Sequence, residues 1–209
     1  APLVYPTPDG YKLFLEAGSM ENLSKLHLKD AVSFWNEMMA HPNRDTFWQQ
    51  RDILPHLKNV APAVMVVTGW YDAEDLYGSF KSYHSIEKLN PKVNNVLVVG
   101  PWHHGGWASG DGDKLGRISF SSKTAAFYRA EIEFPFFERY LKDGQQPAPA
   151  EATVFETGSN VWRTFDAWPP KGTQSKQLYL REKEQLDFAA PTTKETFDAY
   201  GSDPAKPVP

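Results

Sequence analysis

The sequence predicts an α/β protein with a parallel sheet. Residues 64–68 and 96–99 are continuous apolar runs rich in β-branched side chains, a pattern typical of strands buried on both faces. Between them, residues 73–89 repeat apolar side chains at helical spacing, and Asn90-Pro91 ends that helix. A strand, a helix and a second apolar strand in this order indicate a right-handed βαβ unit.

The composition is that of a globular protein. Of the 209 residues, 41% are hydrophobic and 14% aromatic. The net charge of -4 gives no electrostatic reason for a nucleic-acid partner, and no apolar run reaches the roughly 20 residues of a membrane-spanning helix. Cysteine is absent, which excludes disulfides, a catalytic thiolate and cysteine-ligated zinc. We expect no nucleic-acid partner, no membrane contact and no cofactor.

The chain divides into three regions, and the βαβ unit lies in the second. Residues 1–60 are predicted to be a helical segment, with one apolar face between Leu23 and Met39 and a short helix capped by Asp45. Residues 61–146 hold the strands, a Gly-rich loop and a long amphipathic helix from about Ser122 to Leu141, which Pro135 should kink or divide.

The third region, residues 150–209, has all-β character. Short strand patterns separated by turn residues occur at 152–156, 162–165 and 177–180. Three or four such strands are too few to close a sandwich, since jelly rolls need about eight. We expect an incomplete β domain.

Polar side chains follow both predicted strands: Asp72 after the first and His104 after the second. Because the carboxyl ends of parallel strands lie at one edge of a sheet, about 4.8 Å apart, these side chains can come within hydrogen-bonding distance. A carboxylate that holds an imidazole fixes its tautomer and leaves the other ring nitrogen free to act as a base. The pair predicts two members of a Ser-His-Asp triad.

The nucleophile of such a triad is missing from this chain. In α/β-hydrolases the order is nucleophile, acid, histidine, so the serine should lie upstream of Asp72. There is no Gly-x-Ser-x-Gly, and Ser109 in Gly-Trp-Ala-Ser-Gly is one residue out of place. The chain also opens at Ala1 without methionine. We therefore expect a piece of a longer protein, inactive alone, whose partner is the N-terminal remainder of that protein.

The site residues also have structural readings. Asp72 can cap the following helix, and Glu74 and Asp75 can be first-turn acids favoured by the helix dipole. The pair His103-His104 can be a metal site together with Asp111 and Asp113. Adjacent histidines in a flexible loop are poor chelators, however, and the acids do not follow a calcium-loop spacing, so we expect no metal. Four aromatic residues at the strand ends can belong either to the core or to the wall of a pocket, and their position favours the pocket wall. They are Trp70, Tyr71, Trp102 and Trp107.

Two motifs make the prediction more specific: Thr-Gly-Trp-Tyr-Asp-Ala-Glu-Asp (68–75) and Val-Gly-Pro-Trp-His-His-Gly (99–105). They resemble the acid and histidine motifs of the CocE/NonD hydrolases. That family includes cocaine esterase, α-amino acid ester hydrolases, glutaryl-7-aminocephalosporanic acid acylases and X-Pro dipeptidyl peptidases. Residues 41–48, 132–137 and 156–170 resemble the family as well, so the similarity covers nearly the whole chain.

The resemblance implies the C-terminal portion of an α/β-hydrolase core (61–146), preceded by a helical cap segment (1–60) and followed by the truncated beginning of a jelly-roll domain (150–209). It implies that Asp72 is the acid and His104, not His103, the catalytic histidine. In amino-ester hydrolases, acidic residues near the pocket bind the substrate ammonium. The candidate substrate-binding residues are Tyr71, Glu74, Asp75 and Trp102.

The function that follows is part of a serine hydrolase that cleaves ester or amide bonds through an acyl-enzyme. Its substrate would be a small ester or amide, or a short peptide. The alternative is a non-catalytic binding or interaction module with a vestigial Asp-His pair. A partial sheet exposes strand edges, so we also expect the chain to need its companion segment or to form a homo-oligomer.

Overall fold

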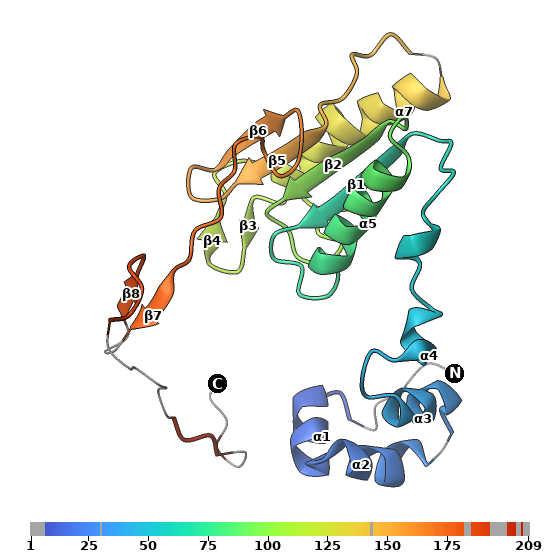
Figure 1. The fold of residues 1–209 in the computed structure, drawn as a ribbon, viewed down its shortest axis with the longest axis vertical. Helices are drawn as coiled ribbons and strands as arrows, with labels where there is room; N and C mark the ends of the chain where they lie inside the picture. The colour runs from blue at the N-terminus through green and yellow to red at the C-terminus, as the bar shows by residue number, and fades with distance from the viewer. Residues whose placement is uncertain are drawn as a thin grey trace. The chain divides into compact units, whose positions relative to one another are not determined.

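The computed structural model describes residues 7–29, 31–142, 144–181, 185–192, 200–203 and 206. The chain divides into two compact units: residues up to 62 together with 80–93, and residues 63–79 together with 94–209. The boundary falls within α5 (Leu76–Leu89), the helix that connects the first two strands (Figure 1). None of the described helices is long and apolar enough to cross a membrane.

Before residue 62, the regular elements described in the first unit are all helices. In chain order these are α1 (Gly10–Ala17), α2 (Met20–Leu23), η1 (Ser24–Leu28), α3 (Ser33–Ala40), α4 (Thr46–Gln49) and η2 (Leu54–His56). Asp45 caps α4 as predicted, because its Oδ1 accepts a hydrogen bond from the Phe47 N–H at 2.9 Å. The continuous apolar face predicted from Leu23 to Met39 is wrong. The chain leaves helical geometry after Leu28, where Lys29 adopts a left-handed conformation with φ 46°.

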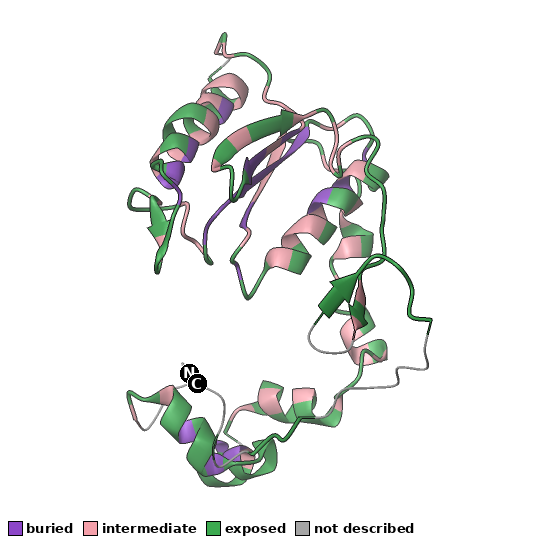
Figure 2. Cartoon of the chain, turned by 90° about the vertical axis from the view of Figure 1, so that its left-hand side faces the viewer, coloured by how far each residue is buried: buried purple, intermediate pink, exposed green. Residues whose placement is uncertain are grey.

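The second unit is built on a four-stranded sheet with the order β1-β2-β5-β6 (Figure 1). Its strands are β1 (Val64–Gly69), β2 (Asn95–Gly100), β5 (Ala152–Glu156) and β6 (Val161–Phe165). The first three are parallel and β6 is antiparallel to β5, so the predicted parallel pair of β1 and β2 is confirmed. All six residues of β2 are buried, as expected for a central strand (Figure 2).

The strands predicted at 152–156 and 162–165 belong to this core sheet and not to a separate jelly roll. In β5, Ala152 and Val154 lie opposite Leu97 and Val99 of β2, and both β5 side chains are buried. An apolar β5 covers the free edge of β2, and β6 then extends the sheet through a tight turn. Later in the chain, β7 (Tyr179–Arg181) and β8 (Gln185–Asp187) pair only with each other among the described strands. A jelly roll beyond β6 stays a prediction.

The helix predicted near residues 122–141 is divided, as Pro135 led us to expect. It consists of α6 (Thr124–Phe127), the π-helical η3 (Tyr128–Glu133) and α7 (Phe134–Leu141). Pro135 lies in the first turn of α7, where its missing N–H is tolerated. Side chains of α6 and η3 pack on Val98 of β2 in a core cluster with Trp102, Ala125 and Tyr128. This helical layer therefore covers one face of the sheet. Between β2 and α6, β3 (Lys114–Leu115) and β4 (Ile118–Ser119) form a short hairpin.

Candidate active site

The segments that leave β1 and β2 continue side by side past the sheet. The Trp70 N–H donates to the Gly100 carbonyl at 2.9 Å, and the Tyr71 N–H donates to the Trp102 carbonyl at 3.0 Å. Gly69 makes this approach possible, because a Cβ at that position would lie 2.1 Å from the Trp102 carbonyl oxygen. The two segments are thus held at a fixed separation directly before Asp72 and His104.

Asp72 and His104 contact each other, as the strand-end argument predicted. His104 Nδ1 lies 3.1 Å from Asp72 Oδ2 and 3.3 Å from Oδ1. The Asp72 side chain is only 1% exposed, whereas that of His104 is 48% exposed. Asp72 Oδ1 also accepts the N–H groups of Glu74 and Asp75, each at 2.9 Å. The capping interaction and the histidine contact therefore coexist on one carboxylate.

The charges in this site favour an ionised Asp72 and a basic His104. The Asp75 N–H bond, more than any other contact, holds the pKa of Asp72 below its ordinary value, and the Glu74 N–H and His104 act in the same direction against the effect of burial. The hydrogen bond to Asp72 raises the pKa of His104 above 6.5, and the negative charge of Glu74 adds to it. A carboxylate only accepts hydrogen bonds, so Nδ1 is the donor and neutral His104 presents Nε2 as an acceptor.

The two predicted substrate-binding acids, Glu74 and Asp75, lie beside the histidine. Asp75 Oδ2 is 3.6 Å from His104 Nδ1, and the charges of Glu74 and Asp75 both act on the ring. Both acids are exposed, and Tyr71 is 39% exposed with its ring 6.2 Å from that of Phe120. These three residues are open to a ligand.

Trp102 is a core residue and not a pocket wall. Its side chain is 2% exposed, its ring packs in the core cluster, and its Nε1–H donates to Thr124 Oγ1 at 2.9 Å. The chain turns inward after Gly100, which the position of Trp102 at a strand end did not reveal. Its predicted substrate contact is therefore wrong. Trp107 also packs against this core.

His103 does not take part in the pair. Its side chain is exposed and its Nδ1 lies 2.9 Å from the His104 carbonyl, so the structure separates the two adjacent histidines as the family motif implied. Over the described part of the chain, no group of three or more histidine or acidic side chains could hold a metal ion. The arrangement supports acid-base chemistry by His104.

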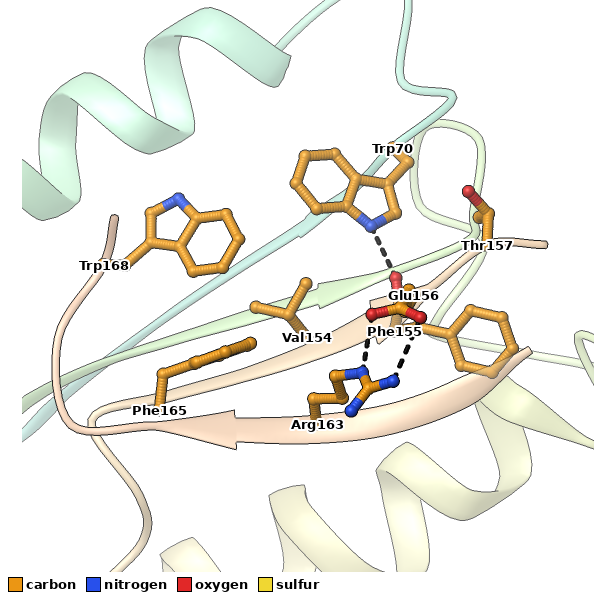
Figure 3. A pocket seen from close by; sticks show the side chains of 8 residues that line it. All are labelled: Trp70, Val154, Phe155, Glu156, Thr157, Arg163, Phe165 and Trp168. Carbon is orange, nitrogen blue, oxygen red and sulfur yellow. Dashed lines mark hydrogen bonds and ion pairs between the residues drawn. The ribbon is translucent and has the colours of Figure 1, made fainter. Parts of the chain in front are cut away.

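A hollow of about 230 Å³ is lined mainly by side chains of β5 and β6, together with Trp70 after β1 (Figure 3). Trp70 forms part of its wall and donates its Nε1–H to the Phe155 carbonyl at 2.8 Å. Glu156 and Arg163 form an ion pair at its edge. The other lining residues are Val154, Phe155, Thr157, Phe165 and Trp168. Sequence reasoning missed this hollow because it assigned β5 and β6 to another domain.

The chain is similar to known peptidases and esterases. The profile of the family described as X-Pro dipeptidyl-peptidase (S15 family) matches residues 6–106. Cocaine esterase from Rhodococcus sp. (strain MB1 Bresler) is 25% identical over 206 residues, which cover 92% of this chain and 35% of that protein. The chain thus spans about one third of this relative.

Two solved structures share the fold at higher identity. An aminopeptidase from a marine sediment archaeon, Thaumarchaeota archaeon, superposes with a TM-score of 0.86 at 35% identity, over 99% of this chain and 34% of that one. A selenomethionine-labelled α-amino acid ester hydrolase gives 0.85 at 33% identity, over 99% and 35% of the two chains. Together with the motifs around Asp72 and His104, these similarities support a hydrolase of the CocE/NonD family.

Proposed function

We propose that this chain supplies the acid and the base of a serine hydrolase that cleaves ester or amide bonds. The observation that carries the proposal is the contact of a buried Asp72 with a half-exposed His104. The serine would come from a segment outside this chain, because no Gly-x-Ser-x-Gly occurs within it.

In the proposed mechanism His104 moves one proton twice. Nε2 takes the proton of the serine hydroxyl as the oxygen attacks the carbonyl carbon of the substrate. The imidazolium then gives that proton to the leaving alcohol or amine, and an acyl-enzyme remains. Water repeats the sequence and releases the acid. Asp72 stays ionised throughout and stabilises the imidazolium, in agreement with its lowered pKa.

The acids beside His104 favour a substrate that carries a free amino group. Glu74 and Asp75 place two exposed carboxylates next to the reacting histidine, where an ammonium ion would be attracted. The names of two relatives, an aminopeptidase and an α-amino acid ester hydrolase, point to the same substrate class. Tyr71 would form part of the pocket wall.

The test of the triad uses p-nitrophenyl esters. The isolated 209-residue chain should show no turnover above that of His104→Ala. The protein that also carries the serine should lose turnover in His104→Ala but not in His103→Ala, a matched control that does not touch Asp72. Full activity of His104→Ala in the longer protein contradicts the base role, and would favour the alternative of a binding module. His104-dependent turnover by the isolated chain contradicts the need for an external serine.

The test of the substrate class compares amino-acid p-nitrophenyl esters with analogues that lack the amino group. The double variant Glu74→Gln, Asp75→Asn should lower kcat/KM for the amino ester about 10-fold or more, the effect of losing one charge-assisted contact. The loss for the analogue should be smaller, because it arises only from the lower pKa of His104. Asp111→Asn, which removes an exposed acid paired with Lys123, serves as the control. Equal losses on both substrates would rule out ammonium recognition by these acids.

A further inference from the structure

The loop that carries His104 is closed at its base by one buried hydroxyl. We term residues 102–112 the histidine loop, which begins at Trp102 and ends at Gly112. Thr124, the first residue of α6, is fully buried. Its Oγ1 accepts the Trp102 Nε1–H at 2.9 Å and donates to the Gly112 carbonyl at 2.5 Å. The two ends of the loop are therefore joined through a single side chain.

Trp102 connects this contact to the Asp72–His104 pair. Its carbonyl accepts the Tyr71 N–H at 3.0 Å, beside Asp72, and His104 follows two residues later. Its ring packs against three others, with centroid distances of 6.1 Å to Trp107, 5.4 Å to Tyr128 and 5.9 Å to Trp162. Because the ring is packed in this way, a change in the indole position moves the carbonyl and the start of the loop together.

The remainder of the loop is fastened to the same helical segment. Arg129 in η3 donates from Nη1 to the Trp107 carbonyl at 2.9 Å and from Nη2 to the Gly110 carbonyl at 2.6 Å. Gly112 has a φ of +68°, and a Cβ there would lie 2.7 Å from the Ala125 Cβ, so the end of the loop lies directly against α6. The loop is held at its start, middle and end.

The hydrogen bonds of Thr124 indicate that its hydroxyl serves the loop and not its own helix. A threonine at a helix start ordinarily offers its oxygen to the first N–H groups of the helix. Here Lys123 is the N-cap without a side-chain cap bond, and Thr124 bonds to Trp102 and Gly112 instead. Thr68 is equally buried, yet its hydroxyl has no hydrogen-bond partner in the described structure. Burial alone therefore does not require the bonds that Thr124 makes.

We propose that Thr124 is a positioning residue, which holds the His104 ring against Asp72 by fixing Trp102 and the base of the histidine loop. The catalytic meaning of this role rests on the proposed function. The position of the ring can be measured without catalysis.

The test compares Thr124→Val, Thr124→Ser and Thr68→Val in the 209-residue chain. The pKa of His104 is read from the pH titration of its ring carbon–proton NMR signal, assigned with His104→Gln. Valine keeps the shape of Thr124 but not the hydroxyl, so Thr124→Val should lower the pKa of His104 toward 6.5, its value without a partner. Serine keeps both hydrogen bonds and should keep the raised pKa, and Thr68→Val should leave it unchanged. A wild-type pKa in Thr124→Val overturns the proposal, as does an equal fall in Thr68→Val.

Trp102→Phe keeps the proposal testable if Thr124→Val does not fold. This substitution removes the donor of the same hydrogen bond and should also lower the pKa of His104. In the double variant with Thr124→Val, the pKa of His104 should be no lower than in either single variant. A wild-type pKa in a folded Trp102→Phe variant overturns the proposal.

Kinetics separate this proposal from the proposed function. In the protein that carries the serine, Thr124→Val should lower kcat about 10-fold or more at unchanged KM, because the substrate contacts remain and only the alignment of the base is lost. If no His104-dependent turnover exists there, the proposed function fails, and the NMR comparison alone decides the role of Thr124. If turnover depends on His104 but kcat is unchanged in Thr124→Val, the positioning role fails and the proposed function stands.

Discussion

Replacing Gly69 by alanine tests whether the spacing of the two post-strand segments controls the Asp72–His104 contact. The new Cβ would lie 2.1 Å from the Trp102 carbonyl oxygen, where an ordinary contact is 3.4 Å or more. The segments must therefore separate by about 1.3 Å. The new Cβ is fixed directly to the backbone and the Trp102 carbonyl oxygen belongs to it, so neither atom can rotate away as the end of a flexible side chain would. His104 Nδ1 is 3.1 Å from Asp72 Oδ2, so a shift of this size can take the pair beyond hydrogen-bonding distance.

The expected result is a lower free energy of unfolding and a lower pKa of His104. Overpacking of this kind costs about 1–3 kcal/mol of unfolding free energy. The assay is urea unfolding followed by tryptophan fluorescence, since five of the seven tryptophans lie in the unit that holds the sheet. The NMR titration of His104 should show its pKa falling toward 6.5.

Gly78→Ala is the matched control for this substitution. Gly78 lies in α5, and nothing lies within 4 Å of the position that its Cβ would occupy. Alanine there should add about 0.5–1 kcal/mol of stability, because glycine is unfavourable within a helix. If Gly69→Ala matches wild type in both stability and His104 pKa, the close approach of the two segments does not govern the contact and the reasoning fails.

Three further predictions concern the same unit. Asp72→Asn should bring the pKa of His104 down, and in the protein that carries the serine should lower kcat about 10⁴-fold, with pH-dependent NMR and p-nitrophenyl ester kinetics as the measurements. Because the folded-state pKa of His104 is raised, its contribution to stability should be complete below pH 6.5 and lost as the pH rises through the raised value. The difference in unfolding free energy between wild type and His104→Gln should accordingly be larger at pH 6 than at pH 9, and an equal difference at both would refute this. Trp102→Ala should cost about 3–5 kcal/mol in urea unfolding, whereas a loss below about 1 kcal/mol would show that Trp102 is not part of the core.

The sequence was most informative where local pattern and chemistry coincide. The apolar runs that became β1 and β2 are short, rich in β-branched side chains and bounded by turn residues, so their parallel pairing could be inferred from the sequence. The predicted burial on both faces holds for β2 but not for β1, where Val64 to Val67 are only half-buried because β1 ends the described sheet. The placement of Asp72 and His104 followed from that pairing. The choice of His104 over His103 needed the family motif, because periodicity does not separate adjacent residues in a loop.

Features that depend on distant partners could not be read in the same way. The pattern of β5 is that of any short half-buried strand, and only the free edge of β2 decides which sheet it joins. Trp102 was predicted as a pocket wall because it follows a strand. Its indole N–H instead meets Thr124, 22 positions later, in a core that no local window contains. The hollow next to Trp70 could not be predicted for the same reason, because much of its lining comes from β5 and β6.

The register of β1 and β2 makes the Asp72–His104 pair a reporter of folding. Val64 to Gly69 lie opposite Asn95 to Gly100, and the two side chains follow those strands by three and four residues. A slip of two residues would displace one strand end by about 6.6 Å, at roughly 3.3 Å per residue, which is far beyond the reach of a hydrogen bond. The His104 signal would then titrate as an isolated imidazole. During refolding, its titration would therefore distinguish chains with correctly paired strands from compact but misaligned intermediates.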